Sequence, residues 1–153
     1  HVTDVKLHIA DLDAIEETLA ERFPQLELRR GQSEFRWYGQ WVNDFHGPRA
    51  AADTGYDPKT FGRCEHAIGI KGQKSYEIGL VKRADGGPGW ALLYDNYDRQ
   101  LEPIAGVELA TLRREYAVTV ATRKAKATLA RKGWTVSRED LPGNRIRLKL
   151  RKR

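Results

Sequence analysis

Short runs of alternating or continuous apolar residues, separated by turn sequences, constrain this fold more than any other feature of the sequence. Three successive runs, at 66–70, 76–81 and 90–94, have the length and apolar content of β-strands. Between them lie Lys71-Gly72-Gln73-Lys74 and Asp85-Gly86-Gly87-Pro88-Gly89. Such glycine-rich segments join neighbouring antiparallel strands. The middle of the chain therefore predicts an antiparallel sheet.

The N-terminal part predicts the order strand, helix, strand, strand. Val5, Leu7 and Ile9 alternate with polar residues, as in a half-buried strand. Asp11 stands where a helix N-cap belongs, and apolar residues then recur at helical spacing as far as Phe23. Pro24 ends this helix. Two short strands are expected to follow, around residues 26–28 and 35–38.

The last third predicts a long helix and a final hairpin. The helix is expected over 107–132, and Gly133 is a typical residue to follow a helix C-terminus. Its expected apolar stripe is Leu109, Leu112, Tyr116, Val120, Ala127 and Ala130. Strands at 134–137 and 146–150 are expected on either side of a Pro142-Gly143-Asn144 turn.

These elements predict one α+β domain spanning residues 1–153, with an antiparallel sheet and two main helices on one face. We expect an elaboration of the ferredoxin-like pattern. Residues 39–63 carry Gly and Pro without clear periodicity and form an expected irregular insert. A chain of 153 residues can bury enough apolar surface to fold without disulfides.

The positive charge is concentrated at the C-terminal end of the chain. Residues 101–153 hold 14 basic and five acidic residues, a net charge of +9, whereas the whole chain carries +6. A basic surface of this kind favours an acidic partner, most often nucleic acid. Two other interpretations stay open, an acidic protein partner and a solvated face that keeps an edge strand from aggregating.

The candidate nucleic-acid-binding residues lie on the long helix and on the final strand, where alternation places the cations opposite the apolar positions. They are Arg113, Arg114, Lys124, Arg131, Lys132, Arg145, Arg147, Lys149 and Arg151.

Several segments resemble an uncharacterised family of small phage and bacterial proteins related to hypothetical chloroplast reading frames. They are Cys64-Glu65-His66-Ala67-Ile68, Tyr76-Glu77-Ile78-Gly79-Leu80-Val81, Leu92-Leu93-Tyr94-Asp95-Asn96-Tyr97 and the closing hairpin with Arg145-Ile146-Arg147-Leu148. The resemblance implies a compact α+β domain encoded by a phage or bacterium, and it carries no assigned activity. The accessory binding role that we expect comes from the charge distribution and not from the resemblance.

The insert is rich in aromatic residues, which suggests a second kind of function. Trp41, Phe45 and Tyr56 are candidate partner-binding residues, because Tyr and Trp are enriched at interface hot spots. The alternative function is therefore a protein–protein interaction module, such as a host-factor inhibitor or an assembly component. The opposing interpretation is that these side chains are buried and form the core of a lid over the sheet.

Two weaker patterns suggest chemistry. Cys64 and His66, with Asp44 and His46 upstream, could supply zinc ligands, although their spacing fits no strong template. The acids Asp95, Asp98 and Glu77 suggest a metal-dependent nuclease as a further alternative. We nevertheless expect a non-enzymatic binding protein without a metal or cofactor.

The sequence also predicts a location. No run of apolar residues is long enough for a membrane helix, and no signal-peptide pattern is seen. We expect a cytoplasmic protein without a membrane partner, in the host cytoplasm if the gene belongs to a phage.

Overall fold

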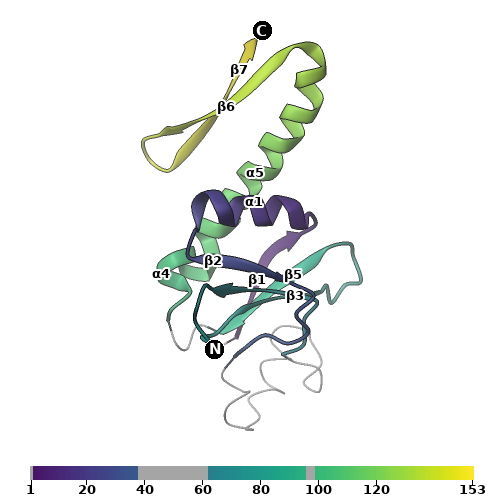
Figure 1. The fold of residues 1–153 in the computed structure, drawn as a ribbon, viewed down its shortest axis with the longest axis vertical. Coiled ribbons are helices and arrows are strands. Elements are labelled where there is room, and N and C mark those ends of the chain that lie inside the picture. The colour runs from purple at the N-terminus through teal and green to yellow at the C-terminus, as the bar shows by residue number, and fades with distance from the viewer. Residues whose placement is uncertain (1, 38–61, 96–98) are drawn as a thin grey trace.

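A five-stranded antiparallel sheet forms the body of the protein in the computed structural model, which describes residues 2–37, 62–95 and 99–153 (Figure 1). The strand order is β1-β5-β4-β3-β2, so the first two strands of the chain form opposite edges. The strands are β1 (Val2–Ile9), β2 (Leu26–Arg30), β3 (His66–Ile70), β4 (Ile78–Lys82) and β5 (Trp90–Asp95).

Two main helices cover one face of this sheet. They are α1 (Leu12–Arg22) and α5 (Ala110–Leu129). Shorter helical elements precede and follow α5, namely α4 (Glu102–Ala105), η1 (Val107–Leu109) and η2 (Ala130–Lys132). Ile15 and Leu19 of α1 and Leu112 of α5 share one buried cluster with Ile68 and Leu80 of the sheet. Their burial removes apolar surface from water and holds the layers together.

Polar contacts fix where the two helices meet. The Asp11 carboxylate accepts a hydrogen bond from the Ala14 amide at 3.0 Å and caps α1, as the sequence predicts. The hydroxyl of Tyr116 on α5 accepts hydrogen bonds from the amides of Ala10 and Asp11, at 3.1 and 3.3 Å. The start of α1 is thus tied to the buried side of α5.

The opposite face of the sheet is covered by the segment that follows β2. Phe35 is fully buried there among Ala67, Val81 and Leu93. Gly79, the second residue of β4, makes room for the ring, because a Cβ atom at this position would lie less than 3.0 Å from three Phe35 ring atoms. A glycine therefore permits this second layer.

The final hairpin stands apart from the five-stranded sheet. Its strands are β6 (Trp134–Leu141) and β7 (Arg145–Lys152), and among the described residues they pair only with each other. In Figure 1 α5 rises from the body, and the hairpin lies along its far half at the end opposite the N-terminus. Gly133 and Gly143 adopt positive φ values of 78° and 77° at the two turns, which glycine adopts without strain.

Most of the predicted elements are confirmed. The α+β class, the antiparallel sheet and the two main helices are observed, whereas this strand order does not confirm a ferredoxin-like elaboration. The expected strand at 35–38 is wrong for its described part, since residues 35–37 form no strand and only Glu34 makes a bridge, with Arg63. The expected apolar stripe on α5 is wrong beyond Val120, because Ala127 and Ala130 are exposed. The insert at 39–63 lies outside the described residues except for its last two.

Substituting Gly79 by Ala tests the fit of Phe35 against β4. Ala normally stabilises a strand interior relative to Gly by about 0.5–1 kcal/mol. Here we expect a loss of about 1–3 kcal/mol in unfolding free energy, because the new methyl group overlaps the ring. The measurement is urea denaturation of Gly79→Ala alone and combined with Phe35→Ala. The penalty should vanish in the double variant, and a single variant more stable than the wild type would contradict this packing.

Candidate nucleic-acid interface

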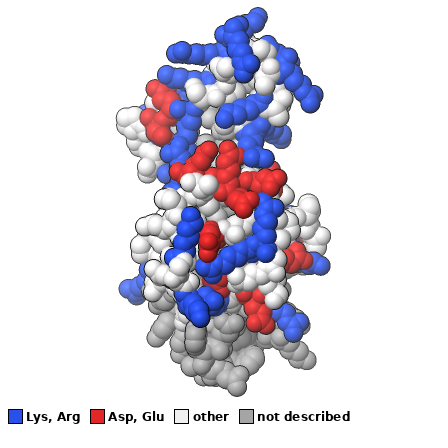
Figure 2. Space-filling view, in the orientation of Figure 1, with Lys and Arg blue, Asp and Glu red and all other residues white. Residues whose placement is uncertain are grey.

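Residues 121–153 form a projecting unit that we call the C-terminal arm. It comprises the far half of α5, η2, β6 and β7, and none of its residues is fully buried. The arm has 12 basic and two acidic residues, a net charge of +10, so the other 120 residues carry −4. In Figure 2 the blue side chains crowd the arm, and a band of acidic side chains lies across the middle of the molecule, near α1. The net positive charge of the chain is therefore located on the arm, although 15 of the 27 basic residues lie elsewhere.

The register of the hairpin divides its side chains between two faces. Ser137 pairs with Lys149 and Glu139 with Arg147, so these four side chains lie on one face, which we call the outer face. Its complete set is Thr135, Ser137, Glu139, Leu141, Arg145, Arg147, Lys149 and Arg151. The inner face carries Trp134, Val136, Arg138, Asp140, Ile146, Leu148, Leu150 and Lys152.

The inner face packs toward α5. Val118, Thr122, Ala125 and Leu129 are half-buried at helical spacing, which marks the side of α5 that meets β6. The cover is incomplete, since Leu150 remains 48% exposed. This layer holds the hairpin without forming a fully buried core.

The cations of α5 and those of β7 lie on different sides of the arm. Lys124 lies two positions after the half-buried Thr122, and Arg131 lies two positions after the half-buried Leu129. Two positions correspond to a rotation of about 200° around a helix. Both therefore face away from the hairpin. Arg113 is half-buried near the base of α5, with its Nε without a hydrogen-bond partner. The nine predicted residues thus do not form one continuous surface.

The candidate cations differ in how far they are already neutralised. Glu139 lies 3.6 Å from Arg147 and 3.3 Å from Lys149, and Glu115 lies 3.5 Å from Arg114. Arg145 donates a hydrogen bond to the Pro142 carbonyl. Four others are exposed and form no ion pair within the described part of the chain, namely Lys124, Arg131, Lys132 and Arg151. The arm therefore presents charge that remains available to a polyanion.

A buried carboxylate anchors the arm to the body. Glu115 of α5 is 5% exposed and accepts hydrogen bonds from both terminal nitrogens of Arg138 on β6, at 2.5 and 3.0 Å. Arg22 of α1 lies 3.7 Å from the same carboxylate. The hydrogen bond and charge of Arg138, with the charges of Arg22 and Arg114, hold the pKa of Glu115 below its ordinary value. One acid thus joins α1, α5 and the hairpin.

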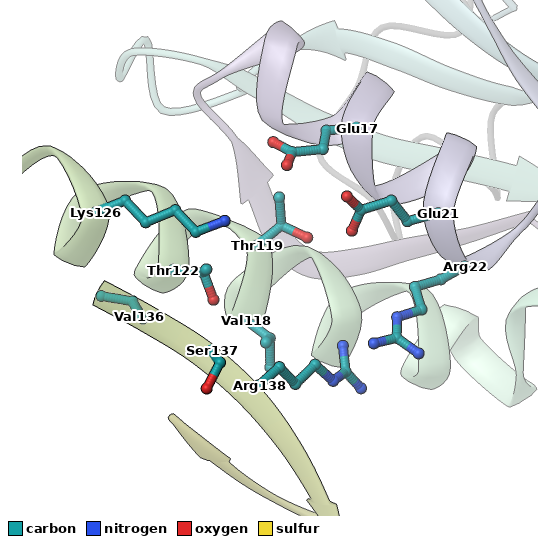
Figure 3. A pocket seen from close by; sticks show the side chains of 10 residues that line it. All are labelled: Glu17, Glu21, Arg22, Val118, Thr119, Thr122, Lys126, Val136, Ser137 and Arg138. Atoms are coloured by element: carbon teal, nitrogen blue, oxygen red, sulfur yellow. The ribbon is translucent and has the colours of Figure 1, made fainter. Parts of the chain in front are cut away.

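A second ion pair connects the far half of α5 to α1. Arg123 donates to Glu17 at 2.7 Å and lies 4.0 Å from Asp11. Between these contacts and Arg138 lies a pocket of about 140 Å³ (Figure 3). Figure 3 shows Glu17 and Glu21 of α1 on one side and Val136 and Arg138 of β6 on the other, with α5 between them.

The possible metal ligands are engaged elsewhere. The Cys64 thiol donates to the Gln32 carbonyl at 3.1 Å, and burial, with Glu77 and Glu34 nearby, raises the pKa of Cys64 to about 12. His66 accepts a hydrogen bond from the Gly31 amide at Nδ1, 3.0 Å away, and its ring meets Trp90 edge-on. Asp44 and His46 lie outside the described residues. Within the described ranges, no three Cys, His, Asp or Glu side chains form a metal-binding group.

Glu77 is buried in a hydrogen-bonded cluster. Its carboxylate accepts from Arg29 at 2.6 Å, Gln32 at 2.8 Å and the Arg36 amide at 3.0 Å. These three hydrogen bonds use most of the roughly four lone-pair positions of the carboxylate, and two of the donors come from Arg29 and Arg36, whose charges compete with a cation. Asp95 is also buried, at the end of β5, whereas Asp98 lies outside the described residues.

The aromatic candidates cannot be placed. Trp41, Phe45 and Tyr56 all lie within residues 38–61, outside the described ranges, so partner binding by them remains a prediction.

No protein-family model, curated protein or solved structure matches the chain. The resemblance to the phage and bacterial family therefore also stays a prediction. Among the described helices, none combines the length and the apolar character needed to cross a membrane.

The anchor of the arm was missed by the sequence analysis. Glu115 lies between Leu112, Tyr116 and Thr119 on the buried side of α5, and Arg138 shares the inner face of β6 with Val136. A carboxylate on the buried side of α5 and an arginine next to an apolar residue on the inner face of β6 have opposite signs, and this is a signal that could have suggested their pairing.

Replacing Arg138 by Met tests the anchor. The change leaves Glu115 buried without its strongest partner, and we expect a loss of about 2–3 kcal/mol in unfolding free energy. Amide hydrogen exchange should also become faster in β6 and β7. The matched control is Arg145→Met on the outer face, which should change stability by less than about 0.5 kcal/mol. Equal effects of the two substitutions would contradict an anchoring role.

The stabilisation from Glu115 should depend on pH. Because its pKa is lower in the folded protein than its ordinary value of 4.5, ionised Glu115 stabilises the fold above that value. This stabilisation is lost as the pH falls from 4.5 toward the folded pKa. Urea denaturation between pH 7 and pH 3 should therefore show wild type and Glu115→Gln converging in acid. Glu21→Gln, an exposed change on α1, should show no comparable convergence.

Proposed function

We propose that this protein is a non-enzymatic nucleic-acid-binding protein that uses the C-terminal arm. The observation that carries the proposal is the concentration of +10 net charge on an arm that projects from a body of opposite charge. Polyanion affinity depends on how many cations can exchange counterions for phosphates. The exposed cations that lack an ion pair, together with those held only by Glu139, can make this exchange.

The shape of the arm supports the same proposal. A projecting helix and hairpin can approach a long polyanion without a collision with the body, and the acidic band near α1 discourages phosphates from lying across it. An acidic protein would satisfy the same charges, but it would not need a row of cations at regular spacing along a strand.

The two alternatives rest on weaker observations. The interaction-module hypothesis depends on Trp41, Phe45 and Tyr56, which lie outside the described residues. The nuclease hypothesis depends on acidic residues that would bind a metal ion. One of them, Glu77, already accepts three hydrogen bonds from neighbouring residues. We therefore propose binding without catalysis, in an accessory role.

Salt-dependent DNA binding tests the proposal. Wild-type protein should bind DNA with an affinity that falls steeply with salt, at a log–log slope of about −0.9 for each phosphate contact. Arg145→Ala, Arg147→Ala and Lys149→Ala together should reduce that slope by about two to three and weaken binding at least tenfold. Fluorescence anisotropy at several salt concentrations measures both quantities.

A matched triple variant controls for net charge alone. Lys71→Ala, Lys74→Ala and Lys82→Ala remove the same charge from exposed positions on the body. This control should retain nearly wild-type affinity. Equal weakening by both triple variants, or no DNA binding by the wild type, would overturn the proposed function.

A further inference from the structure

The outer face of the hairpin lacks the features of a surface that binds single-stranded nucleic acid. Proteins that bind single-stranded nucleic acid stack bases on aromatic side chains. None of the eight outer-face residues is aromatic, and Trp134, the one aromatic residue of the arm, is half-buried on the inner face. The outer face instead combines four cations and the Glu139 carboxylate with two hydroxyl groups. The Ser137 hydroxyl can hydrogen-bond to base edges or phosphates, whereas the Thr135 hydroxyl donates to the Arg151 carbonyl at 3.2 Å.

The dimensions of the outer face suit a duplex groove. A two-stranded ribbon, with strands about 4.8 Å apart, fits a major groove about 12 Å wide. The row from Arg145 to Arg151 extends over six residue steps, or about 20 Å at 3.4 Å per residue. That length equals the axial rise of about six base pairs, and because the groove is inclined to the axis, a ribbon along it spans fewer base pairs and can still face successive phosphates on one wall of the groove.

The packing of the arm leaves this face open and pre-formed. Arg145, Arg147, Lys149 and Arg151 are all exposed, and the inner face is held against α5 through Arg138 and Glu115. Glu139 keeps Arg147 and Lys149 close to one carboxylate, so their positions are partly fixed before a ligand arrives.

We propose that the outer face of the β6–β7 hairpin binds double-stranded DNA in the major groove. This inference rests on the proposed function and names its ligand. B-form DNA is the favoured duplex, because the major groove of A-form RNA is too deep and narrow for side chains to read. The cations of α5 lie on the other side of the arm and contribute little to this contact.

The first experiment compares ligands by fluorescence anisotropy at fixed salt. The probes are a 20-base-pair DNA duplex, one of its single strands, the corresponding RNA duplex, and the DNA duplex with bulky groups at cytosine C5, which project into the major groove. We expect the plain DNA duplex to bind at least tenfold more tightly than the other three. Equal or tighter binding of the single strand, the RNA duplex or the obstructed DNA would overturn this inference while leaving the proposed function intact. No binding of any probe would overturn both.

The second experiment compares the two sides of the arm. The double variant on the hairpin, Arg147→Glu with Lys149→Glu, should weaken duplex binding at least tenfold. The control double variant on the α5 side, Lys124→Glu with Arg131→Glu, makes the same charge change and should weaken binding less than threefold. A larger loss from the α5 pair would overturn the assignment to the hairpin. If the hairpin variant with two glutamates fails to fold, glutamine can replace glutamate at the same positions, because it removes the charge and keeps the side chains long. Arg147→Gln with Lys149→Gln should then weaken duplex binding more than Lys124→Gln with Arg131→Gln does.

Discussion

The ion pair between Glu115 and Arg138 determines how the last quarter of the chain is arranged. An isolated two-stranded hairpin is marginally stable in water, and no residue of the arm is fully buried. Apolar burial alone therefore cannot fix the hairpin in one orientation. The buried carboxylate of Glu115 requires a charged partner, and Arg138 supplies two hydrogen bonds to it. Since Arg138 lies on one face of β6, this pairing also decides that the cations of β7 point outward.

The body and the arm are stabilised by different interactions. In the body, helices α1 and α5 cover one face of the sheet with apolar side chains, and Phe35 covers the other face over Gly79. In the arm, half-buried apolar residues and ion pairs such as Arg123–Glu17 replace a core. Ion pairs at exposed positions are weakened by salt. Positive charge on the arm thus also contributes to holding the arm against α1.

The local elements were predictable, and their assembly was less so. Periodicity located His66–Ile70, the cap at Asp11 and the end of the long helix before Gly133, because each depends on neighbouring residues. The prediction that Ala127 and Ala130 belong to the buried apolar stripe of α5 was wrong, because helical spacing shows only which residues lie on the same side of a helix. Burial needs another layer, and the sheet does not extend beneath the far half of α5. Likewise, the alternation in β7 predicted that its cations share one face of the strand. It could not show that the hairpin forms a two-stranded sheet apart from the five-stranded sheet.

The sequence by itself determined the strands other than the one expected at 35–38, the two main helices, the concentration of positive charge and the alternation that separates Arg147 and Lys149 from Leu148. All of these follow from short-range spacing and composition. Only the tertiary structure decided that the cations of α5 and β7 lie on opposite sides of an arm, and that Glu77 and Cys64 are occupied by internal partners. These outcomes depend on contacts between residues far apart in the chain, such as Glu115 with Arg138, which no local pattern specifies.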